Sequence, residues 1–282
     1  MNPQRLFAPS GSSTGSAPTA LRPAPWAHAI HKPVFIAFLL GFTFNWVTLL
    51  LGLSTDWPRT EELFWTLAAT TTLVGLARRL WEQNLLMSAS IIAGIAFVVA
   101  VAADRTGVPY GPRTYSDYLG GKILGVPWPM PLIWIVVIIA CRGVARLILR
   151  PWRKTMYYGF WVIGLACLLA VWLDLALEPF ATRVRRYWFW QTSKDVLNWY
   201  STPWVNFLGW GVTALGILGF ATPWLINKQP VKQPTDFHGL ALWLLLNFYF
   251  ATGNALNGLG LAAGVSLAGM AAVTVCAVRG AR

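Results

Sequence analysis

Long apolar segments recur along almost the whole chain. A helix needs about 20 mostly apolar residues to cross the hydrocarbon core of a membrane. Segments of about that length cover residues 33–53, 61–80, 84–103, 127–148, 156–177, 204–226, 238–256 and 259–279. Asn254, Asn257 and Gly258 separate the last two, which could instead form one broken element. We therefore expect an all-α fold, a polytopic membrane helix bundle with about eight transmembrane helices.

The amino-acid composition also indicates a membrane protein. Charged residues make up only 11% of the 282 residues, whereas a soluble domain carries about 25%. Residues 1–30 differ from the rest because Ser, Pro, Ala and Gly dominate there, so we expect a disordered N-terminal tail. Residues 31–282 should then form a single transmembrane domain.

The net charge of +12 does not indicate a nucleic-acid partner, because the basic residues lie between apolar segments rather than in a separate domain. Basic residues are common in cytoplasmic loops, where they lie close to anionic lipid head groups. With eight crossings, 14 of the 22 Lys and Arg residues fall on the side that holds both termini. We therefore expect a multi-pass protein of a bacterial or archaeal cytoplasmic membrane with both termini in the cytoplasm. Arg183, Arg185 and Arg186 would lie outside, against this rule.

Cysteine and histidine offer no metal-binding pattern. Cys141, Cys167 and Cys276 all fall within apolar segments and form no C-x-x-C pair. The three histidines are not closely spaced, as membrane di-iron oxygenases would require, and none lies in the middle of an apolar segment, as a haem ligand would. We therefore expect neither a metal nor another cofactor.

Two acidic residues stand at the end of the fifth apolar segment. Asp174 and Glu178 are four residues apart and share one face of a helix, which Pro179 should stop. Carboxylates at such depth are costly and usually functional. We expect Asp174 at the outer edge of the hydrocarbon layer, with Glu178 farther out and in more contact with water. Alternatively, both are structural charges paired with Arg183 or Arg186.

In this topology the loops after the third, fifth and seventh segments emerge on one face. The first of them, residues 105–131, contains too much Gly and Pro for a regular helix, so we expect a packed re-entrant or interfacial segment. Many of the 17 tryptophans fit an interfacial belt, although some could line a slot for a long apolar ligand. The groups that gather on this face are Asp104, Tyr110, Tyr115, Asp117, Asp174, Glu178, Trp188, Trp190, Asn198, Asn206, Asn254 and Asn257.

Three motifs in this region resemble those of the membrane carotenoid-biosynthesis hydratases, a family that includes carotenoid 1′,2′-hydratases and bisanhydrobacterioruberin hydratases. They occur in the family's order between about residues 105 and 224. The motifs are Gly107-Val-Pro-Tyr-Gly-Pro with Tyr115, Leu119-Gly120 and Gly125-Val-Pro; Asp174-Leu-Ala-Leu-Glu-Pro with Trp188-Phe-Trp190; and Pro203-Trp-Val-Asn-Phe-Leu-Gly-Trp. Two features depart from the family pattern. Arg113 stands where an aromatic residue is common, and residues 91–103 lack a glutamate that members often carry.

The resemblance implies addition of water to the terminal 1,2 double bond of an acyclic carotenoid end group, which gives a tertiary alcohol without a cofactor. A carboxylic acid would protonate C2, and water would attack the cation at C1. We expect Asp174 to be the acid and Glu178 to position or deprotonate the water, with Asp104 and Asp117 as further candidate acids. The residues expected to bind the substrate, shield the cation or orient the water are Tyr110, Tyr115, Trp188, Trp190, Asn206 and Trp210.

Two other functions remain open. A membrane prenyltransferase or elongase of carotenoid synthesis would need Mg²⁺ held by paired acidic motifs, and Asp174-x-x-x-Glu178 supplies one such pair. A non-catalytic carotenoid-binding protein is the other alternative. In each case the expected partners are a lipophilic carotenoid and membrane lipid, and other enzymes of the carotenoid pathway are candidate partners.

Overall fold

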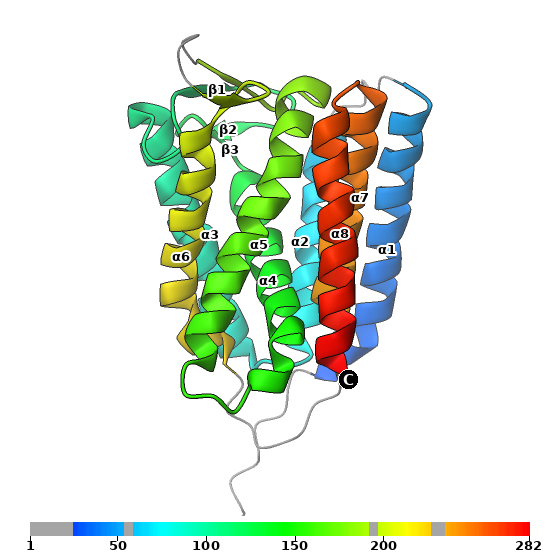
Figure 1. Cartoon of the computed structure of the whole chain (residues 1–282), viewed down its shortest axis with the longest axis vertical. Helices are drawn as coiled ribbons and strands as arrows, with labels where there is room; N and C mark the ends of the chain where they lie inside the picture. Colours follow the sequence, from blue (N-terminus) through cyan, green and yellow to red (C-terminus); the bar gives the residue numbers. More distant parts are fainter. Residues whose placement is uncertain (1–24, 54–58, 192–196, 227–234) are drawn as a thin grey trace, which may run out of the picture.

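The computed structural model describes residues 25–53, 59–191, 197–226 and 235–282. Eight long helices run up and down through these residues and pack into one bundle (Figure 1). This arrangement confirms the expected all-α fold. The helices are α1 (Pro25–Leu50), α2 (Thr60–Ala77), α3 (Glu82–Thr106), α4 (Met130–Ile148), α5 (Tyr158–Pro179), α6 (Trp204–Leu225), α7 (His238–Leu256) and α8 (Gly260–Ala281).

Seven of these helices are long and apolar enough to cross a membrane, so the protein is a multi-pass integral membrane protein. The exception is α2, whose 18 residues include Glu61 and Glu62. The last two apolar segments are separate helices, α7 and α8, which pack against each other. The first helix begins and the last helix ends at the same end of the bundle (Figure 1), as expected for eight helices that run alternately up and down.

The first helix begins earlier than expected. Residues 1–24 of the predicted disordered tail lie outside the described residues, but residues 25–30 belong to α1, so the predicted boundary at residue 30 was wrong. Tertiary contacts explain the earlier start. Ala27 is fully buried, and Trp26 Nε1 donates a hydrogen bond of 2.8 Å to Glu82 at the start of α3.

The core of the bundle lies around α4, which packs against α2, α3, α5, α7 and α8. Small residues permit one of these contacts. A Cβ atom on Gly143 of α4 would lie 3.3 Å from the Cα atom of Gly239 in α7, and one on Gly239 would lie 3.2 Å from the Cα atom of Gly143. Such close backbone approach is a common way for helices to associate in membranes.

Short strands cover the end of the bundle opposite the first residue of α1 (Figure 1). The segment between α3 and α4 is irregular, as predicted, and carries β1 (Arg113–Tyr115), β2 (Lys122–Ile123) and β3 (Val126–Pro127). Between α5 and α6 lie β4 (Trp188–Trp190), β5 (Asn198–Trp199) and β6 (Thr202–Pro203). β1 pairs antiparallel with β4, and β2–β3 and β5–β6 form two further antiparallel pairs. The β1–β4 pairing therefore joins the two loops that the sequence placed on one face.

The α-helix ends at Pro179, as predicted, but the chain stays helical beyond it. It continues through a π-helical turn, Phe180–Val184. The amide of Arg185 donates to the carbonyl of Phe180 at 2.9 Å, five residues earlier, and the Thr182 hydroxyl donates to the carbonyl of Glu178 at 2.7 Å. Such wide turns often occur at functional sites.

Candidate active site

The carboxyl groups of Asp174 and Glu178 lie together beneath the strands, and both side chains are 0% exposed. The predicted contact of Glu178 with water was therefore wrong. Asn206, in the first turn of α6, joins the two groups. Its Nδ2 lies 2.7 Å from Asp174 Oδ2 and 3.2 Å from Glu178 Oε1. Buried carboxyl groups require such partners, because removal from water is otherwise very costly.

The two carboxyl groups have different surroundings. Glu178 Oε2 accepts hydrogen bonds from Trp188 Nε1 at 3.2 Å, Trp190 Nε1 at 2.9 Å and the Thr202 hydroxyl at 3.0 Å. This set of donors suits an ionised carboxylate, which can only accept. Asp174 Oδ1, by contrast, has no hydrogen-bond partner among the described residues. Asp174 thus keeps one oxygen free to carry a proton.

The structural alternative, in which Arg183 or Arg186 neutralises the pair, is not observed. Arg183 donates to the carbonyl of Tyr200 and lies over the Tyr200 ring. The ion pairs found in the described part of the chain include neither Asp174 nor Glu178. The carboxyl groups are therefore held by neutral donors rather than by a contacting basic side chain.

Arg113 occupies the centre of an aromatic box. Its guanidinium carbon lies 4.7 and 4.8 Å from the ring centroids of Tyr110 and Tyr115, and 5.4 and 5.6 Å from those of Trp188 and Trp190. Sequence reasoning noted Arg113 only as a departure from the family pattern and gave it no role. The four rings expected to shield a substrate cation instead surround a cation of the protein itself, through contacts of the cation–π type.

Two tyrosines connect this box to its surroundings. The hydroxyls of Tyr110 and Thr213 lie 2.9 Å apart, which attaches the loop to α6, and Arg113 donates to the Tyr115 hydroxyl. Burial raises the pKa of both Tyr110 and Tyr115, so both side chains are neutral near pH 7. Thr213 and Thr202 were both missed at the sequence level, because a threonine in an apolar helix or a turn carries no pattern of its own.

The other predicted residues lie apart from the pair. Trp210 is buried in a stack with Trp134 of α4, with ring centroids 4.5 Å apart. Asp117 forms an ion pair of 2.8 Å with Lys122, and its side chain is 95% exposed. Asn254 donates to the carbonyl of Ala176 and thus attaches α7 to α5 rather than to the carboxyl groups.

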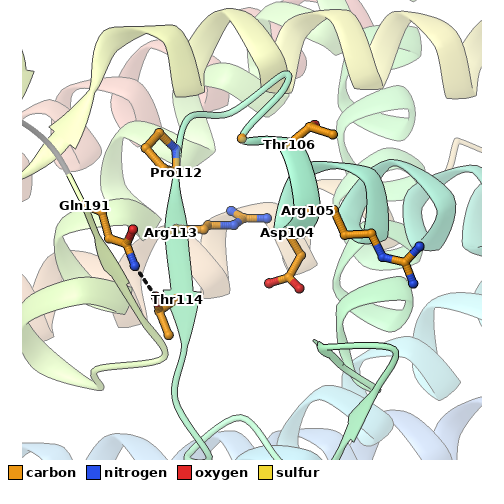
Figure 2. Close-up of a pocket in the computed structure, with 8 residues that line it drawn as sticks. Asp104, Arg105, Thr106, Pro112, Arg113, Thr114 and Gln191 are labelled. Carbon is orange, nitrogen blue, oxygen red and sulfur yellow. Dashed lines mark hydrogen bonds between the residues drawn. The ribbon is translucent and has the colours of Figure 1, made fainter.

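Asp104 lies at a pocket of about 420 Å³ between the end of α3 and β1. Figure 2 shows its carboxylate and the guanidinium of Arg113 projecting into the same space. The lining is mostly polar and comprises Asp104, Arg105, Thr106, Gly107, Pro112, Arg113, Thr114 and Gln191. The pocket thus reaches one side of the aromatic box.

A buried ion pair supports β4 from the other side. Arg185 Nε lies 3.2 Å from Glu61 Oε1 of α2, and the Tyr187 hydroxyl donates to the same carboxylate. Arg185 also donates to the Tyr249 hydroxyl of α7 at 2.6 Å. These contacts hold the residues just before Trp188 against two helices. Glu61, a glutamate within an apolar segment, was the available sequence signal for this pair. Its partner Arg185 could not be predicted from the sequence.

Fold and site together define a class: a multi-pass helical membrane protein with a buried carboxyl pair under a short aromatic sheet. The chain belongs to the carotenoid biosynthesis protein family, which matches residues 60–275. All the candidate site residues lie within that range. Membership confirms the resemblance seen in the motifs.

One characterised relative shares part of this region. The chain is similar to the bisanhydrobacterioruberin hydratase of Haloarcula japonica, with 29% identity over 127 residues. The match covers 42% of this chain and 41% of the relative, so it spans less than half of either protein. No solved structure matches the chain.

Proposed function

We propose that this protein adds water to the terminal 1,2 double bond of an acyclic carotenoid end group and forms a tertiary alcohol. Family membership supports a carotenoid substrate, and the similarity to a hydratase supports the reaction type. The observation that carries the proposal is the unequal carboxyl pair. One member is surrounded by donors, the other has a free oxygen, and Asn206 links them.

Asp174 is the acid in the first step. The proton on its Oδ1 moves to C2 of the end group, and the π electrons of the C1=C2 bond form the new C2–H bond. The positive charge is left on C1, where three carbon substituents stabilise it. A general acid must hold its proton until the alkene is in place, and a carboxyl group buried without a contacting cation is suited to do so.

Asn206 and Glu178 direct the second step. Asn206 Oδ1 has no partner among the described residues, so it can accept a hydrogen bond from the attacking water. The water oxygen bonds to C1 and its proton passes to Glu178 Oε1. Return of that proton to Asp174 restores the pair. The balance is one water consumed for each end group modified.

The position of Arg113 changes the role first expected for the aromatic rings. One face of each ring lies against the guanidinium, so that face is not available to the cation at C1. Stabilisation of that cation falls instead to the two carboxylates, Glu178 and the newly ionised Asp174. Fixed charges in a site without bulk water act strongly on developing charge.

The test is expression in cells that make an acyclic carotene such as lycopene, followed by mass spectrometry of the pigments. We expect a product heavier by one water per modified end, and growth in ¹⁸O-labelled water should label the hydroxyl. Oxygen taken from O₂ would contradict hydration. Bound but unchanged pigment would favour a carrier, and a product extended by a prenyl unit would favour the prenyltransferase.

A further inference from the structure

Arg113 connects the polar pocket to the tryptophans that hold the buried carboxyl pair. Arg113 lines the pocket together with Asp104, and both side chains face its interior (Figure 2). On its other side, Arg113 lies against the rings of Trp188 and Trp190, whose Nε1 atoms donate to Glu178. The side chain of Arg113 thus forms the boundary between the pocket and the site.

Three buried polar atoms of Arg113 and the candidate site lack hydrogen-bond partners among the described residues. They are Arg113 Nε, Asn206 Oδ1 and Asp174 Oδ1. They come from β1, α6 and α5, so no single local distortion explains them. Buried polar atoms are normally satisfied by protein or by water, because leaving them unpaired is costly. Each of these atoms can therefore bind a water molecule: Arg113 Nε as a donor, Asn206 Oδ1 as an acceptor, and the protonated Asp174 Oδ1 as a donor.

We propose that this pocket admits the water that is the second substrate, and that Arg113 is the boundary the water crosses. The inference rests on the proposed hydration. A carotenoid is apolar and arrives from the lipid, whereas water needs a polar route to a site that is 0% exposed. Asp104, Arg113, Thr114 and Gln191 give the pocket that polar character. An apolar chain that entered there would remove water from these polar groups, which is costly.

The chemistry of Arg113 suits a filter for water. Its N–H groups can hold passing water molecules, and its fixed positive charge repels hydronium and metal cations, as basic residues do in water-conducting pores. Six per cent exposure and four ring contacts keep the side chain in place. Water would then reach the carboxyl pair without opening the site to bulk solvent.

Blocking the pocket without touching the carboxyl pair tests this inference. In a background with Cys141, Cys167 and Cys276 changed to Ala, we would introduce Thr114→Cys or Gln191→Cys at the pocket wall. Each thiol would be modified with a bulky, permanently charged methanethiosulfonate reagent. Tyr118→Cys is the matched control, because Tyr118 lies in the same loop, is 67% exposed and does not line the pocket. For each variant, the hydration rate before modification is the reference for the rate after modification.

We expect modification at the pocket wall to lower hydration by about tenfold or more while bound carotenoid is retained, and modification of the control to change neither. Hydration above half the reference rate after complete modification of both pocket variants would overturn the water route and leave the hydratase function standing. Loss of bound carotenoid on modification would overturn it too, since the pocket would then admit the carotenoid. Absence of hydration by every unmodified protein, including wild type, would overturn the proposed function itself.

Discussion

Asn206 of α6 donates a hydrogen bond of 2.7 Å to Asp174 of α5, although 32 residues separate them in the chain. This contact is fully buried, and the same amide nitrogen also reaches Glu178. It fixes the relative position of the two helices at the depth of the candidate site. The two carboxyl groups that share this amide differ in their other partners, because Glu178 accepts three further hydrogen bonds and Asp174 Oδ1 accepts none among the described residues. Several substitutions can test this difference.

Asp174→Asn should abolish hydration while the protein still accumulates and retains carotenoid. The change keeps the shape of the side chain but removes the transferable proton. Loss of a general acid costs roughly 10²–10⁴-fold in rate, and we expect the upper end because this acid also generates the cation. Asp117→Asn is the matched control and should stay near wild type, since Asp117 is exposed and pairs with Lys122. Hydration by Asp174→Asn above about a tenth of the wild-type rate would exclude Asp174 as the acid.

Glu178→Gln should damage stability as well as activity. The new amide would direct N–H groups at one or more of the donors Trp188, Trp190, Thr202 and Asn206. An unsatisfied buried group costs about 1–3 kcal/mol, so the detergent-solubilised protein should melt at a lower temperature than Asp174→Asn does. Equal melting temperatures for the two variants would show that the donors do not hold Glu178 as the structure indicates.

The Glu61–Arg185 pair should behave as a coupled unit. Glu61→Gln leaves Arg185 without its charge partner, and removal of one member of a buried pair typically costs about 3–5 kcal/mol. Arg185→Met added to Glu61→Gln should recover part of that loss. Thermal unfolding of the two single variants and the double variant gives the coupling energy. Additive losses would mean that the pair does not position the segment before Trp188.

Gly209→Ala should separate the Tyr110 loop from α6. A Cβ atom there would lie 2.7 Å from both the Pro109 carbonyl oxygen and Tyr110 Cδ1. Overpacking of this kind costs about 1–3 kcal/mol, and hydration should fall with it. Gly216→Ala lies on the same helix and has nothing within 4 Å of the new Cβ, so it should be neutral. Similar melting temperatures for the two variants would argue against close packing at Gly209.

Hydration should survive treatment with EDTA. The indole and hydroxyl groups around Glu178 Oε2 point partial positive charge at the place where a bound cation would lie. Protonation of an alkene by a carboxylic acid also needs no metal. Purified protein assayed with and without the chelator checks this expectation. Activity that is lost with EDTA and restored by Mg²⁺ would favour the prenyltransferase alternative.

Much of the helical bundle could be predicted, because a membrane span leaves a long and continuous signal in a sequence. The segment predicted at residues 204–226, for example, is α6, Trp204–Leu225. The four-residue spacing of Asp174 and Glu178 likewise placed both on one helical face. Their complete burial could not be predicted, since it depends on strands of two or three residues that lie over them. Strands this short have no periodicity to detect.

The surroundings of Arg113 could not be predicted from the sequence either. Its surroundings come from two loops that are brought together by the pairing of β1 with β4, in which Arg113 faces Trp190 and Tyr115 faces Trp188. The sequence indicated that these loops share a face of the membrane but could not supply the register. The sequence showed that Arg113 departs from the family pattern. The box of rings around Arg113 depends on three-dimensional contacts that the sequence does not show.

The order of the site residues along the chain has a consequence for biosynthesis. Glu178 is made before each of the donors that surround it: Trp188, Trp190, Thr202 and Asn206. When α5 leaves the ribosome, its carboxyl groups therefore have none of these partners, and an unpartnered carboxyl group is expensive inside a bilayer. We therefore expect α5 to integrate stably only when α6 follows it and supplies Asn206. On this expectation the two helices insert as a pair, and Asn206 is the last of these partners to be made.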